Sequence, residues 1–223
     1  MQENKLRILL LGSTKGLGKE ILNEALSLGF EINCLVRNAK KFPIEENNIR
    51  VFEGDATSSI DLENAVQDSK IIISTLNVMR KNLFPWSNIT NDKNTISKSS
   101  KNIIEISKRK KVKHLISVSA WGVNESLDHI PIWFKLLIKN SNLKYPYIDH
   151  GKSEKLLVNS NLNWTILRPS ALVNFLNNHQ VKESISLKNK PSLIISRKSL
   201  AKFIINIVDK KNYYNKIVTV SKK

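Results

Sequence analysis

The chain has 223 residues, 41% of them hydrophobic, which suits one folded domain and excludes a wholly disordered protein. Its single cysteine excludes a disulfide framework or a cysteine-based zinc site within one chain. The formal net charge of +17 is compatible with a nucleic-acid partner, but the lysines are spread along the whole chain, which favours a solvated basic surface.

Apolar runs alternate with helical patterns along the sequence. The runs predict strands at 6–12, 31–37, 49–55, 70–76, 113–120, 163–170, 192–195 and 215–221. The patterns predict helices at 18–29, 62–67, 94–111, 150–160 and 197–210. This alternation is typical of an α/β protein with a parallel sheet covered by helices on both sides. We expect a single domain over 1–223, with 170–223 as a small substrate-side C-terminal part.

The stretch LLLGSTKGLGKEI places Gly12, Gly16 and Gly18 between the first strand and the first helix. A strand, a tight glycine turn and a helix together set backbone N–H groups and a helix N-terminus against a phosphate. In this interpretation Gly12 permits the turn, Gly16 admits a pyrophosphate, and Gly18 lets the helix pack close to the sheet. Short glycine motifs also occur by chance, and it is the strand-to-helix context that strengthens this one.

The end of the second predicted strand, where the adenosine ribose is usually bound, carries Arg37 and no acidic residue. An arginine there can bind a 2′-phosphate, and Lys15 adds a second positive charge, so the pair favours NADP(H) over NAD as the cofactor. Asp55 follows the third strand and could accept a hydrogen bond from the adenine amino group. An aspartate or threonine there could also cap the helix that begins near residue 58, and the two roles are compatible.

Several stretches resemble the atypical short-chain dehydrogenase/reductases: LLGSTKGLG, CLVRN, VFEGDATS, IIISTLN, HLISVSAWG and SEKLLVNSNLNWTILRPS. Within that family the NmrA-like proteins and the biliverdin reductase B (flavin reductase) group are the most similar. The resemblance implies a Rossmann fold, a doubly wound parallel sheet in a three-layer αβα arrangement. The glycine order Gly-x-x-x-Gly-x-Gly departs from the atypical pattern, because Lys15 stands where many relatives have glycine.

The resemblance also implies which residues bind the dinucleotide. They are Gly12, Ser13, Thr14, Lys15, Gly16, Leu17 and Gly18 in the loop, Arg37, Asp55, and the bridging residues Thr75, Leu76 and Asn77. Ser117 and Ser119 would lie beside the nicotinamide, with Pro169 and Ser170 beyond it. No metal ligand set is expected.

The tyrosine acid and the lysine four residues later, which the main short-chain branch uses, are absent: no tyrosine here has a lysine at that spacing. His150 occupies the position where many relatives carry the lysine, and the biliverdin reductase B group similarly has Asp-His there. His150 could donate a proton or orient the nicotinamide ribose, or it could be a helix-start histidine. Ser119 could hydrogen-bond a carbonyl or cap a turn, and Trp121 could form a wall of the acceptor pocket or cover the core.

The missing pair favours an NADPH-dependent reductase that passes hydride to a flavin, a tetrapyrrole or a similar conjugated small molecule, because such an acceptor delocalises charge. The first alternative is an NmrA-like, non-catalytic NADP(H) sensor that binds a protein partner. The second is a nucleic-acid binder, which we do not expect. The oligomeric state is left open.

The N-terminal apolar stretch is too short for a signal peptide, and no run reaches the roughly 18 apolar residues of a membrane helix. We therefore expect a cytoplasmic protein with no membrane partner. Cys34 lies in an apolar strand and is interpreted as a small buried hydrophobe. Two stretches, 80–93 and 121–146, flank the expected nicotinamide end, where their aromatic residues either line a pocket or cover the core.

Overall fold

A computed structural model describes residues 6–42, 46–176, 178–185 and 190–223. Its main sheet has eight strands in the order β3-β2-β1-β4-β5-β6-β10-β8, parallel except for β8, which pairs antiparallel with β10. In chain order these strands are β1 (Arg7–Leu11), β2 (Glu31–Val36), β3 (Ile49–Glu53), β4 (Ile71–Ser74), β5 (His114–Val118), β6 (Trp164–Pro169), β8 (Val181–Ser184) and β10 (Lys216–Lys222). A short parallel pair joins β7 (Ala171–Val173) to β9 (Ile194–Ser196).

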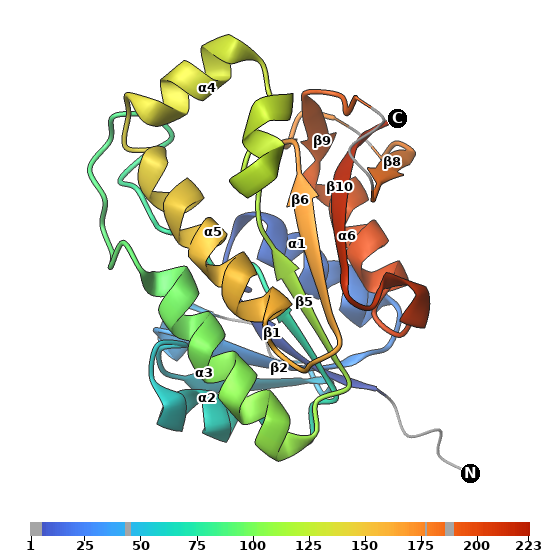
Figure 1. The fold of residues 1–223 in the computed structure, drawn as a ribbon. Coiled ribbons are helices and arrows are strands. Elements are labelled where there is room, and N and C mark those ends of the chain that lie inside the picture. The colour runs from blue at the N-terminus through green and yellow to red at the C-terminus, as the bar shows by residue number, and fades with distance from the viewer. Residues whose placement is uncertain (1–5, 43–45, 177, 186–189) are drawn as a thin grey trace.

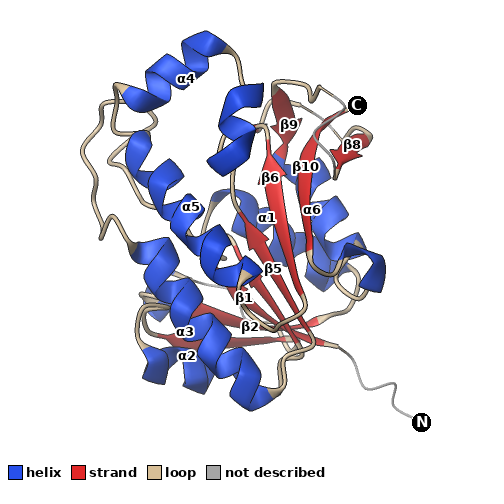
Figure 2. Cartoon of the chain, in the orientation of Figure 1, coloured by secondary structure: helices blue, strands red, loops and turns tan. Residues whose placement is uncertain are grey.

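Helices cover both faces of the sheet (Figure 1, Figure 2). They are α1 (Gly16–Ser27), α2 (Ser59–Val66), α3 (Thr95–Lys110), α4 (Ile132–Lys139), α5 (Lys144–Val158) and α6 (Arg197–Asn206). Short 3₁₀ turns lie at Ala39–Lys41, Asn124–His129 and Lys211–Tyr213. None of these helices, within the residues described, has the length and hydropathy that crossing a bilayer requires.

The alternation of side chains along each strand divides the core into two layers. In β1, Ile8 and Leu10 pack with α1 and α6, whereas Leu9 and Leu11 pack with α2, α3 and α5. All four side chains are fully buried, because a parallel strand with helices on both faces exposes neither side. The predicted fold class, a doubly wound Rossmann-type sheet in three layers, is confirmed.

Local signals explain several helix ends. Ser58 and Ser196 accept hydrogen bonds from backbone N–H groups in the first turns of α2 and α6. The basic residues at 108–110 form the last turn of α3, where they favour the negative end of the helix dipole. Asp149 of α5 accepts hydrogen bonds from the Ile96 and Ser97 N–H groups at 2.7 and 3.2 Å, and so holds the start of α3.

Two helices differ most from the sequence prediction. The helix expected at 150–160 begins six residues earlier, at Lys144, because the proline at 146 lies in the first turn and removes no helical hydrogen bond. The region 121–146 contains α4, a helix that the sequence analysis did not predict, with Lys135 and Lys139 four residues apart in an otherwise apolar segment. Residues 170–223 contribute β8, β10 and the α6 helix that packs on α1, and their substrate-side role stays a prediction.

Candidate functional site

The predicted dinucleotide-binding residues lie at or just after the carboxyl ends of parallel strands. The glycine loop follows β1, Arg37 follows β2, Asp55 follows β3, and Thr75 follows β4. Ser119 and Ser170 follow the next two strands of the sheet, β5 and β6. In open α/β sheets this edge is where ligands bind.

The glycine loop is packed too closely for side chains at two of its glycines. A Cβ atom on Gly18 would lie 2.0 Å from the carbonyl oxygen of Gly12, and one on Gly12 would lie 2.6 Å from Thr75 Oγ1. Gly12 also has a φ of +88°, which favours glycine. The Thr75 hydroxyl donates to the carbonyl oxygen of Leu11 at 3.0 Å and so joins the loop to the end of β4. These contacts support the roles predicted for Gly12 and Gly18.

Gly16 faces open space in front of helix α1. A Cβ atom there would meet only the Arg197 side chain, at 3.8 Å, and the φ of Gly16 is +58°. Lys15 stands at the N-cap of α1 without a side-chain hydrogen bond to the helix, and the first turn contains no acidic residue. The positive end of α1 and its uncapped N–H groups are therefore available to an anion, as a dinucleotide pyrophosphate requires.

The other loop residues divide into two kinds. Thr14 and Lys15 are exposed, whereas Leu17 is buried in the core with α6 and Ser13 is fully buried beside the Cys34 thiol. Burial raises the pKa of Cys34 to about 11, which keeps the thiol protonated and unreactive and confirms its interpretation as a buried hydrophobe. Ser13 and Leu17 are thus placed to bind phosphate only through their backbone N–H groups.

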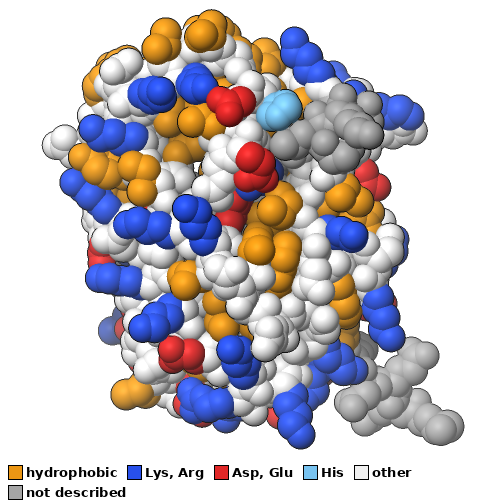
Figure 3. All heavy atoms as spheres, viewed as in Figure 1, with side chains coloured by type: hydrophobic (Ala, Val, Ile, Leu, Met, Phe, Trp, Pro, Cys, Tyr) orange, Lys and Arg blue, Asp and Glu red, His pale blue; other side chains and the backbone are white. Residues whose placement is uncertain are grey.

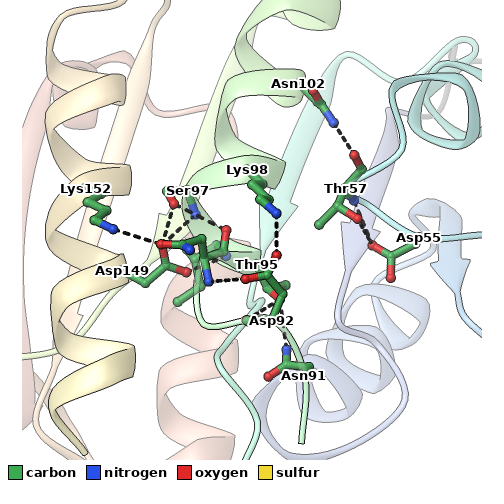
Figure 4. Close-up of polar contacts among 12 residues, drawn as sticks. Asp55, Thr57, Asn91, Asp92, Thr95, Ser97, Lys98, Asn102, Asp149 and Lys152 are labelled. Carbon is green, nitrogen blue, oxygen red and sulfur yellow. Dashed lines mark hydrogen bonds and ion pairs between the residues drawn. The ribbon is translucent and has the colours of Figure 1, made fainter. Parts of the chain in front are cut away.

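Arg37 is exposed, and its guanidinium lies against the Met79 sulfur at 3.0 Å. Asp55 accepts hydrogen bonds from the backbone N–H and the hydroxyl of Thr57, at 2.8 and 2.7 Å (Figure 4). It does not cap α2, because Ser58 does. The capping role was therefore wrong for Asp55, which keeps its Oδ2 atom near the adenosine end of the edge.

At the nicotinamide end Ser117, inside β5, and Pro169, at the end of β6, are buried. The bridging residue Asn77 is exposed, and its carbonyl oxygen lies 3.3 Å from Asn91 Nδ2. The Ser170 hydroxyl and the Trp121 indole N–H are buried without a hydrogen-bond partner among the described residues. Buried polar atoms in folded proteins are normally paired, but Ser99 and Ser107 on α3 are unpaired in the same way, so the lack of a partner does not by itself mark a ligand site.

Ser119 belongs to a buried ionic network that the sequence analysis missed. Its hydroxyl donates to Glu154 Oε1 at 2.7 Å, and the same carboxylate accepts from Arg168 Nε at 2.9 Å and Nη2 at 2.6 Å. Glu125 binds the outer side of the same guanidinium, and Asn124 Nδ2 donates to Glu154 Oε2 at 2.6 Å. Burial lowers the pKa of Arg168, but its hydrogen bonds to the two carboxylates outweigh burial and raise it overall.

This network fixes the direction of the Ser119 proton. Because the proton is donated to Glu154, the Ser119 oxygen presents only acceptor lone pairs to the site. That arrangement suits the amide N–H₂ of a nicotinamide better than a carbonyl oxygen in need of a donor. Glu154 lies one helical turn after His150, and this i,i+4 spacing was the only signal in the sequence that could have pointed to it.

His150 is 4% exposed on the inner face of α5. Burial lowers its pKa to about 4, so the ring is neutral near neutral pH. A neutral ring can orient a ribose hydroxyl through a hydrogen bond, but it is a poor source of protons at that pH. The structure therefore favours the orienting role over the proton-donor role for His150.

The pKa of His150 predicts a loss of stability in acid. Unfolding returns His150 to its ordinary pKa of 6.5, so the unfolded chain takes up a proton that the folded chain refuses. This contribution to stability is complete above pH 6.5 and is lost as the pH falls toward 4. Between about pH 7.5 and about pH 5 we expect a loss of about 2 kcal/mol, measured by chemical denaturation. His150→Gln should reduce this loss, and the exposed His129→Gln should not.

Tyr145 is the described tyrosine that contacts lysines, but Lys93 and Lys144 lie over its ring, with Nζ 4.0 and 5.3 Å from the centroid, and form no hydrogen bond with its hydroxyl, so no acid–base pair is restored. The Tyr147 hydroxyl donates to the Trp121 carbonyl oxygen at 3.4 Å, and the Tyr213 hydroxyl donates to Glu183 at 2.8 Å. Burial raises the pKa of both tyrosines. Lys152, the basic residue two positions after His150 on α5, is exposed and donates to Asn94 Oδ1 at 2.8 Å.

Trp121 is 4% exposed and packs with Ile130 and Ile138 beneath helix α4. Its backbone N–H donates to the Pro169 carbonyl oxygen at 2.9 Å, which joins the ends of β5 and β6. The Trp121 side chain therefore packs against helix α4 and the segment that precedes it. Its role as a pocket wall stays a prediction.

Arg197 is a second residue that the sequence analysis missed. It is the first residue of α6, and its Nε lies 3.8 Å from the position that a Cβ atom would take on Gly16. A hydrogen bond of 2.6 Å to Asn174 Oδ1 holds the guanidinium, and no carboxylate among the described residues forms an ion pair with it. A cation at a helix N-terminus is unfavourable unless an anion lies nearby. Arg197 thus adds positive charge to the mouth of the glycine loop.

A family model described as NAD(P)H-binding matches residues 12–211, which covers the glycine loop and the edge described above. This match confirms the predicted nicotinamide dinucleotide cofactor. The described residues hold no cluster of three or more histidine, cysteine, aspartate or glutamate side chains suited to a metal ion.

Among known proteins, the chain is 27% identical to the photosystem II assembly factor Ycf39 of Cyanidium caldarium, over 73% of this chain and 46% of that protein. It is 23% identical to the chloroplastic protein TIC 62 of Pisum sativum, over 83% of this chain and 36% of that protein. The chain therefore spans less than half the length of these two relatives.

Two solved structures share the fold at low sequence identity. A short-chain dehydrogenase/reductase from Veillonella parvula in complex with NADP superposes with a TM-score of 0.79 at 19% identity, over 97% of this chain and 94% of that one. The anaerobillin reductase ChuY from Escherichia coli O157:H7 superposes with a TM-score of 0.78 at 17% identity, over 97% of both chains.

Proposed function

This chain belongs to the NAD(P)H-binding family, and from that premise we propose that it is an NADPH-dependent reductase of the atypical short-chain type. Its acceptor is a flavin, a tetrapyrrole or a similar conjugated small molecule. The bound NADPH supplies the hydride, and the protein supplies binding and alignment.

Different residues at this edge of the sheet bind different parts of NADPH. The N–H groups at the start of α1 hold the pyrophosphate, with Gly16 leaving room for it. Arg37 and Lys15 bind the 2′-phosphate, and Asp55 Oδ2 accepts from the adenine amino group. Ser119 accepts a hydrogen bond from the carboxamide, and neutral His150 orients the adjacent ribose.

The observation that carries the proposal is the lack of an acidic group, either a tyrosine paired with a lysine or a protonated histidine, at the nicotinamide end of the described structure. The Ser119 proton is donated to Glu154, His150 is neutral, and the hydroxyls of Tyr147 and Tyr213 donate to other groups. A ketone or an alcohol needs a positioned acid or base at its oxygen. A conjugated acceptor spreads the incoming charge and takes its proton from water, so this site suits it.

A thermal-shift series with NADPH, NADH, flavin mononucleotide and biliverdin tests the proposal. NADPH should raise the melting temperature more than NADH does at equal concentration. The nicotinamide absorbance should then fall with at least one conjugated acceptor and stay constant with simple ketones. Reduction of ketones at a comparable rate would contradict the proposed acceptor class.

The same lack of an acid suits a second function, a non-catalytic NADP(H) sensor that binds a protein partner. NADPH binding without oxidation by any acceptor in the series, together with a partner that binds only one redox form, would favour the sensor over the reductase.

Arg37→Ala tests the choice of cofactor. Loss of a charge-assisted hydrogen bond to the 2′-phosphate should weaken NADPH binding by about tenfold or more and leave NADH binding within about twofold. Isothermal titration measures both affinities. The matched control is Arg50→Ala, which removes an exposed arginine from β3 and should change neither affinity. Equal losses for both cofactors would place Arg37 away from the 2′-phosphate.

Arg197→Gln should give a different pattern from Arg37→Ala. Because Arg197 lies at the open position of Gly16, we expect it to bind the pyrophosphate, which both cofactors share. NADPH and NADH binding should therefore weaken together, by about fivefold, with a smaller effect from Asn174→Ala. Lys198→Gln, which removes the exposed cation next in sequence, is the control. An unchanged NADH affinity would rule out the pyrophosphate contact.

A further inference from the structure

Large hydrophobic side chains are exposed on two segments at one end of the molecule. Three lie in the loop between β4 and α3, and three on helix α4: Leu83, Phe84, Trp86, Ile132, Trp133 and Leu136, which are 50% to 88% exposed. We call these six residues the α4 patch. Soluble monomeric proteins seldom expose contiguous apolar surface of this kind unless it binds something.

The two halves of the α4 patch are held together by hydrogen bonds. Trp86 Nε1 donates to the Asn140 carbonyl oxygen at 2.9 Å, and the Asn142 N–H donates to the Pro85 carbonyl oxygen at 3.0 Å. Within the loop, the rings of Phe84 and Trp86 pack at 5.3 Å between centroids. The loop therefore lies at the C-terminal end of α4, and both segments lie at the same end of the molecule.

Helix α4 has more apolar surface than its own fold can bury. Ile138 is buried and Phe134 is half-buried, in the cluster that also contains Trp121 and Tyr147. The core side of α4 is thus already satisfied, while Ile132, Trp133 and Leu136 face outward. In the ribbon α4 lies at one end of the molecule, at the top of the view (Figure 1).

Positive charge surrounds the α4 patch. Residues 80–93 and 128–145 contain six basic residues and two acidic ones, and both acidic residues form ion pairs with lysines: Arg80, Lys81, Lys93, Lys135, Lys139 and Lys144 against Asp92 and Asp128. Figure 3 shows hydrophobic side chains at the end of the molecule where α4 lies, with lysine and arginine side chains beside them. An occupant of this surface is therefore both apolar and anionic.

We propose that the α4 patch is a docking surface for an anionic lipid bilayer. Tryptophan and aliphatic side chains on a protruding helix, with lysines at its sides, form the composition that inserts into the headgroup region of a membrane. A second copy of the chain fits less well, because a symmetric contact would bring two basic surfaces together. The expectation of no membrane partner rested on the absence of a spanning segment, which does not bear on a surface contact.

Sedimentation with lipid vesicles provides the first test, with vesicles of phosphatidylcholine alone compared with vesicles containing about one third phosphatidylglycerol. The full chain should bind the anionic vesicles at least about tenfold more tightly, and added salt should weaken the binding. Equal binding to both vesicles, or none to either, would overturn the proposal.

Tryptophan fluorescence reports on the patch itself. Of the four tryptophans, Trp86 and Trp133 are exposed within the patch, and Trp121 and Trp164 are buried. Emission should therefore shift to shorter wavelength when anionic vesicles are added, and lipid-borne quenchers should reduce it. Binding without any change in emission would place the contact elsewhere on the basic surface and overturn the proposal.

Matched variants separate patch binding from general charge attraction. Trp133→Ser with Ile132→Ser should weaken vesicle binding by about tenfold, whereas Ile60→Ser, a 72% exposed isoleucine on α2, should not. Lys139→Gln should weaken binding more than Lys108→Gln at the end of α3 does. NADPH binding and melting temperature should stay unchanged and so show that the variants are folded.

Two outcomes would assign the α4 patch to another occupant. If light scattering shows a dimer that the Trp133 and Ile132 variants dissociate, the patch binds a second copy. If the chain ignores vesicles but binds an acidic amphipathic peptide through the same residues, the occupant is a protein. Either outcome overturns the lipid proposal and leaves the cofactor site untouched.

Discussion

Arg168→Met is expected to lower the free energy of unfolding by about 3–5 kcal/mol, because it leaves the Glu154 carboxylate buried without its cation. Arg168 and Glu154 are 1% and 3% exposed, and two hydrogen bonds, at 2.6 and 2.9 Å, join them. Ser119 and Asn124 can still donate to the carboxylate, but neither carries a charge to compensate it. Urea denaturation, followed by circular dichroism, measures the loss.

Two further variants identify the cause of the loss. Glu125→Gln removes the outer, 59% exposed carboxylate and leaves Arg168 paired with Glu154, so we expect a loss of less than about 1 kcal/mol. The double variant Arg168→Met with Glu154→Gln removes both buried charges and should recover part of the stability. If Arg168→Met lowers the free energy of unfolding by less than Glu125→Gln does, the buried pair is not what holds β6 to α5.

Gly18→Ala should destabilise the fold and weaken NADPH binding together. Alanine is the better helix former by about 1 kcal/mol, so local propensity alone predicts a more stable α1. The new Cβ would lie 2.0 Å from the Gly12 carbonyl oxygen, and this clash with backbone is relieved only if α1 moves away from β1. Because overpacking of this kind outweighs propensity, we expect a net loss of about 2–3 kcal/mol.

The movement of α1 also carries its N-terminal N–H groups away from the pyrophosphate position, so NADPH affinity should fall by about tenfold or more. Asn23→Ala, at an exposed position of the same helix, should raise the melting temperature slightly and leave the affinity unchanged. A Gly18→Ala protein as stable as the parent would contradict the close packing of the loop on the helix.

Local patterns in the sequence were sufficient to predict most strands of the sheet. Each of the eight predicted strands appears within two residues of its expected ends, because a run such as RILLL or EINCLV is apolar on both faces only in a covered parallel strand. The glycine loop was also predicted from the sequence, because a tight turn and a helix packed closely on the strand before it both require glycine. Helix α4 was not predicted, although Lys135 and Lys139 stand four residues apart in this otherwise apolar segment.

The predicted site residues were brought to one edge by the topology, but their chemistry depended on partners distant in sequence. Ser119 is a potential donor in the sequence and an acceptor in the structure, because Glu154 lies 35 residues later and faces it. The pKa of His150 is near neutrality in a peptide and about 4 in the fold, because the ring is buried.

The sequence by itself determined the α/β architecture, the glycine loop between β1 and α1 and the absence of a tyrosine–lysine pair, since each depends on spacing along the chain. Only the tertiary structure decided that Arg197 reaches Gly16, that Arg168 is buried between two carboxylates, and that the α4 patch is exposed. Burial and charge pairing are properties of contacts between segments far apart in the chain, and no local pattern encodes them.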